Sequence, residues 1–284
     1  MLKQLYRFFS PKHQNIFLEY RVDPRPRFGH GLPTHAGLEK IISARTPQYH
    51  EIVKRILALK DALQTIRHAA TKASANDPYW DNGFFPGLDI ASLYAMLTHH
   101  RPGRYIEIGS GNSTMVARRA IREQQLPTHI LSIDPNPRAE IDQLTDEMLR
   151  LPFEQCPLTV FQDLEPGDFV FVDNSHRIFP NSDATVFFLE VLPQLPPGVI
   201  VQIHDVYLPD DYPDFMCDRY YSEQYMLAAF LLSAPQRYRP LFPCWWVSQQ
   251  PDFQEMLAKL WQHPNLEKAE RHGGSFWLEI GTDQ

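Results

Sequence analysis

The chain has 284 residues, a formal net charge of −7 and a hydrophobic content of 43%. This length fits one large α/β domain with an appended segment, or two small domains. The acidic balance argues against a nucleic-acid-binding or membrane-surface protein, because phosphate groups attract a basic excess. We therefore expect a protein that acts on a small molecule.

The first 21 residues carry charges throughout and lack a long apolar run. This pattern is unlike a signal peptide or a spanning helix, and it predicts a cytoplasmic location. Cys156, Cys217 and Cys244 lack the paired spacing of a disulfide framework or a zinc site, which predicts reduced thiols.

Residues 1–100 are predicted to form an N-terminal helical cap. After a loop rich in proline and glycine, apolar residues recur at helical spacing over 46–73, which predicts one long amphipathic helix. An aromatic loop then leads into a second helix that stops at Pro102 and Gly103. We expect the cap to cover the carboxyl edge of the following sheet, with Trp80 and Phe85 near its first loop, because these rings would otherwise be exposed.

Residues 101–284 alternate strands and helices and are predicted to form the second domain. Strands are expected at 104–109, 129–135, 158–163, 168–174, 198–205, 237–247 and 275–281, and helices at 113–123, 138–149, 183–192, 222–232 and 252–261. The rhythm predicts a Rossmann-like α/β fold, with a mostly parallel sheet between helices on both faces. Ligands of such sheets bind beyond the carboxyl ends of the strands.

The first strand ends in two glycines, Gly109 and Gly111. Their lack of a Cβ lets the chain turn tightly and approach a nucleotide-type ligand. A dinucleotide site would have a third glycine where Thr114 stands, so a nicotinamide or flavin cofactor is disfavoured. Glu107 beside the turn would repel pyrophosphate and attract a cationic ligand, which suits an adenosine with an amino acid attached.

Acidic residues follow the next two expected strands. Asp134 comes at the end of the second strand, where its carboxylate can accept hydrogen bonds from both hydroxyls of a ribose. Asp163 closes the expected third strand and is predicted to meet the amino group of an adenine.

Four strand-end sequences in this order carry a family resemblance: YIEIGSGNST, LSIDPNPR, LEPGDFVFVDNSH and LPPGVIVQIHD. Over about residues 80 to 246 the chain resembles the class I S-adenosylmethionine-dependent methyltransferases, in particular a bacterial small-molecule branch with a D-x-S-H motif. The resemblance implies a seven-stranded sheet with an antiparallel final strand and S-adenosylmethionine as the cofactor. It implies cofactor contacts by Glu107, Gly109, Ser110, Gly111, Ser113, Asp134, Asp163 and Asp173.

Methyl transfer to a hydroxyl requires a held acceptor and the removal of a proton, and His176, Asp173 and His204 are the catalytic candidates. In one arrangement Asp173, His204 and Asp205 bind a divalent cation that lowers the pKa of the acceptor, while His176 is the base. Similar catechol-type and macrolide-sugar methyltransferases carry a carboxylate at the position of His204, and an imidazole there disfavours magnesium. In the other arrangement no metal binds, and His176 or His204 acts alone.

The function implied is O-methylation of a small molecule, without a nucleic-acid or membrane partner. Two alternatives stay open, an NAD(P)-dependent Rossmann oxidoreductase and a cofactor-binding protein without turnover. Glu223 and Tyr225 in the helix after the fifth strand are further candidates to face the cleft. The N-terminal helices could also form a homo-oligomer, and the sequence leaves the acceptor open.

Overall fold

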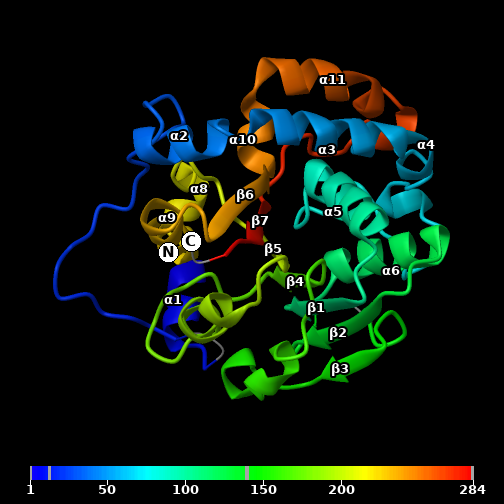
Figure 1. Cartoon of the computed structure of the whole chain (residues 1–284). Coiled ribbons are helices and arrows are strands. Elements are labelled where there is room, and N and C mark those ends of the chain that lie inside the picture. The colour runs from blue at the N-terminus through cyan, green and yellow to red at the C-terminus, as the bar shows by residue number, and fades with distance from the viewer. Residues whose placement is uncertain (1, 12–13, 138–140, 283–284) are drawn as a thin grey trace.

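A seven-stranded sheet forms the centre of the computed structural model, which describes residues 2–11, 14–137 and 141–282 (Figure 1). The strands are β1 (Arg104–Ile108), β2 (His129–Ile133), β3 (Glu147–Leu149), β4 (Phe169–Val172), β5 (Ile200–Ile203), β6 (Tyr238–Pro243) and β7 (Phe276–Ile280). Their order is β3-β2-β1-β4-β5-β7-β6, and β7 is antiparallel to both of its neighbours. The pairs from β3 to β5 are parallel. The predicted mostly parallel sheet and its antiparallel last strand are confirmed.

Helices cover both faces of the sheet (Figure 1). The α-helices are α1 (Leu2–Phe9), α2 (Ala36–Ser43), α3 (Thr46–Ala58), α4 (Lys60–Leu63), α5 (Gly87–His100), α6 (Asn112–Gln124), α7 (Asp183–Val186), α8 (Asp214–Cys217), α9 (Glu223–Ser233), α10 (Cys244–Gln249) and α11 (Pro251–Trp261). The shorter turns of helix are η1 (Ala69–Thr71), η2 (Phe153–Gln155), η3 (Leu158–Phe161), η4 (Phe187–Val191), η5 (Leu192–Gln194) and η6 (Pro264–Leu266). No helix in this part of the chain combines the length and the apolar character that a membrane span needs.

The strand register brings four loops to one edge of the sheet. Ile108 at the end of β1 pairs with Ile133 of β2 and with Val172 of β4, and Val172 pairs with Ile203 of β5. The chain therefore leaves β1, β2, β4 and β5 at the same level. The polar residues that follow these strands start side by side at the carboxyl edge, as the βαβ pattern predicted.

Helix α5 is part of the layer against the sheet, although it lies within the predicted cap. It packs against α6 and α3, and its residues 87–97 are all buried. The helix has no polar face because protein surrounds it on every side. The division of the chain near residue 100 stays a prediction.

Helices α2 and α3 lie beside the β6 end of the sheet (Figure 1). Helix α3 contacts β6, α5 and α11, while α2 contacts β6 and α9. The long helix predicted over 46–73 is wrong, because α3 ends at Ala58 and the chain turns at Leu59. That turn lets Leu63 and Ile66 reach the core, so tertiary packing overrides the helical spacing.

Two elements between β2 and β4 differ from the sequence prediction. The strand expected at 158–163 is a short helical turn, η3, and the third strand of the sheet is Glu147–Leu149, which the prediction had placed in a helix. Pro157 has no N–H to donate to a strand ladder, and Phe161 reaches the core from the loop by packing on Phe153. The predicted helix over 138–149 is wrong for residues 141–149, and its first three residues lie outside the described part.

The strand predicted at 237–247 is also shorter than expected. Strand β6 ends at Pro243, and Cys244 begins α10, so the tryptophans that follow lie on a helix. Trp246 is buried there against Tyr49 of α3. The apolar run over 237–247 therefore comprises a strand and a helix, which an unbroken apolar stretch does not distinguish.

Candidate active site

A tight turn after β1 brings the backbone close to β4. Gly109 has a φ of 80°, and a Cβ at this position would overlap the carbonyl oxygen of Asp173. Any other residue would therefore force β1 and β4 apart at their carboxyl ends. At Gly111 the direction of a Cβ is open, with no heavy atom within 4 Å, so the chain leaves space beside the first turn of α6.

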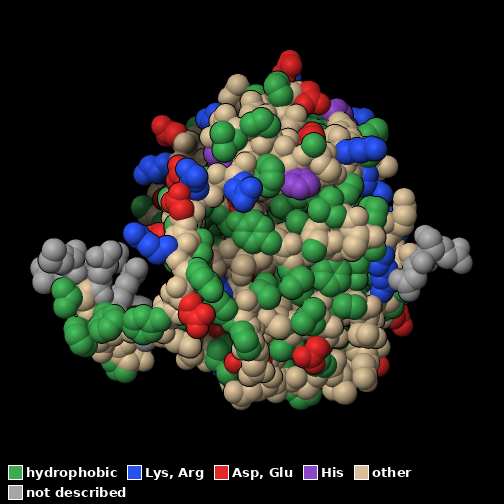
Figure 2. Space-filling view, turned by 90° about the vertical axis from the view of Figure 1, so that its left-hand side faces the viewer, with side chains coloured by type: hydrophobic (Ala, Val, Ile, Leu, Met, Phe, Trp, Pro, Cys, Tyr) green, Lys and Arg blue, Asp and Glu red, His purple; other side chains and the backbone are tan. Residues whose placement is uncertain are grey.

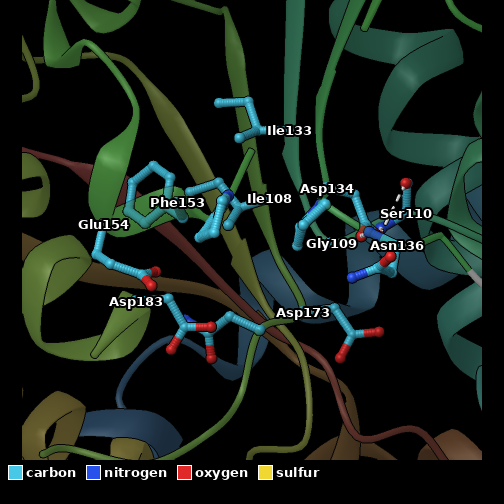
Figure 3. A pocket seen from close by; sticks show the side chains of 13 residues that line it. Ile108, Gly109, Ser110, Ile133, Asp134, Asn136, Phe153, Glu154, Asp173 and Asp183 are labelled. Atoms are coloured by element: carbon cyan, nitrogen blue, oxygen red, sulfur yellow. Dashed lines mark hydrogen bonds between the residues drawn. The ribbon is translucent and has the colours of Figure 1, made fainter. Parts of the chain in front are cut away.

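A cavity of about 350 Å³ opens beside this turn (Figure 3). Asp134, Ser110 and Asn136 line one side of it, and Phe153 and Glu154 line the other. Asp173 and Asp183 lie at its lower rim in this view. The walls come from the loops after β1, β2, β3 and β4, so this cavity is a ligand site of the kind expected at the carboxyl edge.

The carboxylate of Asp134 is held in place by the glycine loop. One oxygen accepts from the backbone N–H and the hydroxyl of Ser110, at 2.9 and 3.1 Å, and the other accepts from the N–H of Asn136 at 2.8 Å. The group lines the cavity with its orientation already fixed. An ionised carboxylate has acceptor sites for further donors, and two ribose hydroxyls provide such donors.

Glu107 lies beneath the loop and is completely buried. Its carboxylate accepts hydrogen bonds from Ser113, Thr114, Ser132 and Tyr105. Burial raises the pKa of this carboxyl to about 7, although the four hydroxyl donors lower it. The expectation that Glu107 attracts a cationic ligand directly is not supported, since its oxygens fasten β1 to β2 and to the start of α6.

Asp163 is at the wrong end of the sheet to meet an adenine. Its carboxylate is 78% exposed and lies 3.9 Å from Arg104, which begins β1. The expectation fails because the strand predicted to end at Asp163 does not form. A cavity of about 770 Å³ lies at this amino edge, but the glycine turn and Asp134 are at the opposite edge.

Beyond the cavity, loops after β4 and β5 and two helices bring together six ionisable side chains. We call them the acid–histidine cluster: Asp89, Asp173, His176, His204, Asp205 and Glu223. His176 and Asp205 have φ values of 61° and 56°. This left-handed conformation costs free energy in residues other than glycine. Residues strained in this way often occur at functional sites.

His176 is buried between carboxylates. Its Nδ1 lies 2.5 Å from Glu223 of α9, and its Nε2 lies 3.3 Å from Asp173 and 3.5 Å from Asp205. Burial alone would lower the pKa of the imidazole, but the charges of Glu223 and Asp173 raise it well above its ordinary value. Glu223 holds the ring through Nδ1, so Nε2 faces the loops after β4 and β5.

His204 at the end of β5 has a similar environment. Its Nε2 lies 3.3 Å from Asp89, and its Nδ1 lies 3.6 Å from Asp173 and 3.7 Å from Asp205. Burial lowers the pKa of this imidazole, while the charges of Asp205 and Asp173 raise it, and the net shift is well upward. The same two histidines keep the pKa of Asp173 below its ordinary value despite the cost of its burial.

Asp89 supports His204 from α5 and was missed from the sequence. The carboxylate is fully buried and accepts hydrogen bonds from the backbone N–H groups of Gly274, at 2.8 Å, and Ser275, at 3.0 Å. It therefore joins the start of α5, the entrance of β7 and the end of β5. Its only sequence signal is an acidic residue in the first turn of an otherwise apolar helix.

The predicted metal site at Asp173, His204 and Asp205 is not supported. Within residues 2–11, 14–137 and 141–282, no three histidine, cysteine or acidic side chains are arranged to hold a metal ion. Both ring nitrogens of His204 face carboxylates. The imidazole of His204 therefore occupies the place between the acids that a cation would take.

The aromatic loop before α5 closes a second cavity, of about 320 Å³, against the glycine loop. Phe85, Phe84 and Tyr79 line it together with Gly111 and Asp173. Phe85 also contacts the ring of His204, with centroids 5.3 Å apart. The prediction that Phe85 lies near the glycine loop is therefore confirmed.

Trp80, also expected there, is buried deeper. It packs against Trp261 of α11, and its indole N–H donates to the carbonyl of Ile66. From the N-terminal segment, the aromatic loop and Asp89 at the start of α5 reach the carboxyl edge, while α2 and α3 contact β6. The covering of this edge by α2 and α3 stays a prediction.

Comparison with known proteins places this site in a described domain family. Residues 106–206 match a family model described as a methyltransferase domain. An uncharacterized protein from Archaeoglobus fulgidus is 31% identical over 93 residues, which are 31% of this chain and 42% of that protein. The chain thus spans less than half the length of the curated relative that it matches.

Solved structures show lower similarity. An O-methyltransferase from Bacillus cereus in complex with SAH is 12% identical, with a TM-score of 0.39 over 86% of this chain and all of the other. The SAH-bound Podospora anserina methyltransferase PaMTH1 is 16% identical, with a TM-score of 0.41 over 90% of this chain and all of the other. The domain match over residues 106–206 agrees with the observed strand order and the antiparallel β7. Residues 106–206 therefore resemble a methyltransferase domain.

Proposed function

We propose that the protein transfers the methyl group of S-adenosylmethionine to a hydroxyl of a small molecule bound between the aromatic loop and the acid–histidine cluster. The observation that carries this proposal is the position of Asp173. Its side chain lines both cavities and lies 3.3 Å from His176. One residue thus joins the nucleotide-type cavity, the aromatic-lined cavity and a buried imidazole that can hold a proton.

The first cavity fits the adenosine part of the cofactor. Asp134 offers a fixed carboxylate for the ribose hydroxyls, and Phe153 presents an apolar wall for a base. Glu154, beside Phe153, takes the place that Asp163 was expected to fill near the adenine amino group. When bound, S-adenosylmethionine supplies a methyl group on a positively charged sulfur.

Thr114 supports this cofactor over a dinucleotide. Its hydroxyl donates to Glu107 and accepts from the N–H of Gly111, at 3.0 Å, and the residue is fully buried. A side chain therefore fills the position at which a dinucleotide motif needs glycine. The NAD(P)-dependent alternative is not favoured.

His176 is the proposed acceptor of the hydroxyl proton. Its Nδ1 is held by Glu223, so the proton can be taken only at Nε2, which points toward Asp173 and Asp205. A base with a raised pKa takes a proton more readily, but only after it has lost its own. We therefore expect the neutral imidazole to be the active form, and turnover to rise with pH.

The second cavity supports a small acceptor. Its volume of about 320 Å³ lies at the lower end of the range for small-molecule sites. Three aromatic rings suit an apolar or aromatic skeleton, while Asp173 lies at the end that approaches the cluster. Asp89 and His204 hold the far wall of the cluster in place.

Replacing Asp134 with alanine is expected to weaken binding of S-adenosylhomocysteine by roughly tenfold to a hundredfold, because hydrogen bonds to a charged group contribute about 1.5–3 kcal/mol. Calorimetric titration would measure the loss. Asp163→Ala is the matched control, since it removes an aspartate at the opposite edge and should leave the affinity unchanged. Equal losses in both variants would refute the assignment of the ribose site.

A further inference from the structure

The N-terminal arm, which we define as residues 5–11 and 14–22, exposes many large apolar side chains. Those that are at least half exposed are Leu5, Tyr6, Phe8, Phe9, Ile16, Phe17, Leu18, Tyr20 and Val22. In Figure 1 the chain between α1 and α2 loops away from the body at the left. Monomeric proteins rarely expose a contiguous apolar surface above a few hundred Å², so a run of this kind marks an interaction site.

Helix α9 presents an apolar stripe on the same side of the molecule. Tyr225, Ala229 and Leu232 are exposed and follow one another at helical spacing. Leu189 is also exposed, and its neighbour Phe188 packs on Phe230 of α9. Figure 2 looks onto this side and shows hydrophobic side chains on the projecting segment and across the middle of the face.

The arm starts close to this stripe. The backbone N–H of Arg27 donates to Asp211 at 3.0 Å, and Asp211 accepts from the hydroxyl of Tyr225 in α9. Gly37 of α2, a few residues further on, lies against Leu232. Residues 27–37, which follow the arm, therefore lie along α9. The stripe nevertheless stays exposed with the arm present in the same chain.

The charges of the arm and of the body are opposite. Residues 1–27 contain six lysine and arginine residues and two acidic residues, which leaves 21 basic and 32 acidic residues in the rest of the chain. A basic arm is attracted to an acidic protein body. An anionic lipid surface would attract the arm but repel that body, so charge favours a second copy of this chain as the partner.

We propose that two copies of the chain form a dimer in which the arm of each copy lies on the α9 stripe of the other. Such an exchange is isologous, so one two-fold axis covers both arms and both stripes. It places exposed apolar residues of the arm against an apolar helix face. The proposal is independent of the acceptor and of the methyl transfer.

Light scattering after gel filtration tests the dimer with the full chain. We expect the wild-type protein at twice its chain mass of 33.0 kDa. Ala229→Glu in the centre of the stripe and Phe17→Glu in the arm should each return it to the monomer mass. Ala70→Glu is the matched control, because Ala70 is also exposed but lies on η1, away from α9. All three variants should keep the stabilisation by S-adenosylhomocysteine, which shows that they are folded.

Three results would overturn the proposal. A monomeric wild-type protein would do so, and co-sedimentation of that monomer with phosphatidylserine vesicles would assign the arm to a lipid surface instead. A dimer that survives both substitutions would place the interface elsewhere. A dimer that is lost with Ala229→Glu but kept with Phe17→Glu would show that α9 pairs without the arm.

Discussion

Replacing His176 with alanine is expected to lower kcat by roughly a hundredfold to ten-thousandfold, the usual range for a lost general base. The imidazole is buried, is held by Glu223 at 2.5 Å, and faces Asp173 and Asp205 with its other nitrogen. Affinity for S-adenosylhomocysteine should change little, because His176 does not line the cavity beside Asp134. Steady-state rates and calorimetric titration measure the two effects separately.

Glu223→Gln is the control for this role, because it keeps the shape of the side chain and removes its charge. The nearby negative charges of Glu223 and Asp173 hold the imidazole pKa well above 6.5. Activity that depends on the neutral imidazole should therefore rise through a midpoint above pH 6.5. Loss of one negative charge destabilises the imidazolium, so the midpoint should move to lower pH. An unchanged midpoint, or full activity of His176→Ala, would contradict the assignment of the base.

Replacing Asp89 with alanine is expected to destabilise the protein by about 3–5 kcal/mol, because it leaves three buried donors without their acceptor at roughly 1–3 kcal/mol each. The carboxylate is fully buried, lies 3.3 Å from His204 and accepts from the N–H groups of Gly274 and Ser275. Without this carboxylate, Nε2 of His204 and the backbone N–H groups of Gly274 and Ser275 lose their acceptor. Thermal unfolding should show a decrease in Tm on the order of 10 °C for a chain of this size.

Asp89→Asn and Asp163→Ala complete this test. The asparagine keeps one oxygen acceptor and should recover part of the lost stability, whereas the exposed Asp163 should be replaceable without cost. If Asp89→Ala unfolds at the wild-type temperature, Asp89 does not hold α5, β5 and β7 together as we describe.

The sequence predicted the strand ends well wherever a buried apolar run ended in glycine or a charged residue. Gly109, Asp134, Asp173 and His204 all follow strands at the carboxyl edge. Such runs form strands because both of their faces are covered by helices. The order of these strands along the chain was therefore sufficient to bring the four residues to one edge.

The region between β2 and β4 could not be predicted in the same way. Residues 158–163 have the composition of a strand, but Leu158–Phe161 form a helical turn after Pro157. The actual edge strand has only three residues, Glu147–Leu149, and pairs with β2 alone. A strand of three residues at the edge of a sheet has little apolar pattern to detect. The prediction that Asp163 meets the adenine depended on the strand at 158–163 and is therefore wrong as well.

The partners of the two histidines depend on packing between distant segments. Asp89 lies 115 residues before His204 in the sequence, and nothing in the spacing joins them. Glu223 was expected only to face the cleft, whereas it fixes the ring of His176. Helix α5 places Asp89 at the end of β5, and α9 places Glu223 against the loop after β4. The two imidazoles lie among these carboxylates, at the place where the metal hypothesis put a cation.

The most direct test of the account is transfer of a labelled methyl group from S-adenosylmethionine to small molecules of a cell extract, with products separated by mass. We predict a labelled product heavier than its precursor by one methylene, formed by the wild-type protein and strongly reduced with His176→Ala. The label should stay with a hydroxyl oxygen of the acceptor. Binding of S-adenosylmethionine without any labelled product, over a broad range of extracts, would contradict the account and leave a cofactor-binding protein without turnover.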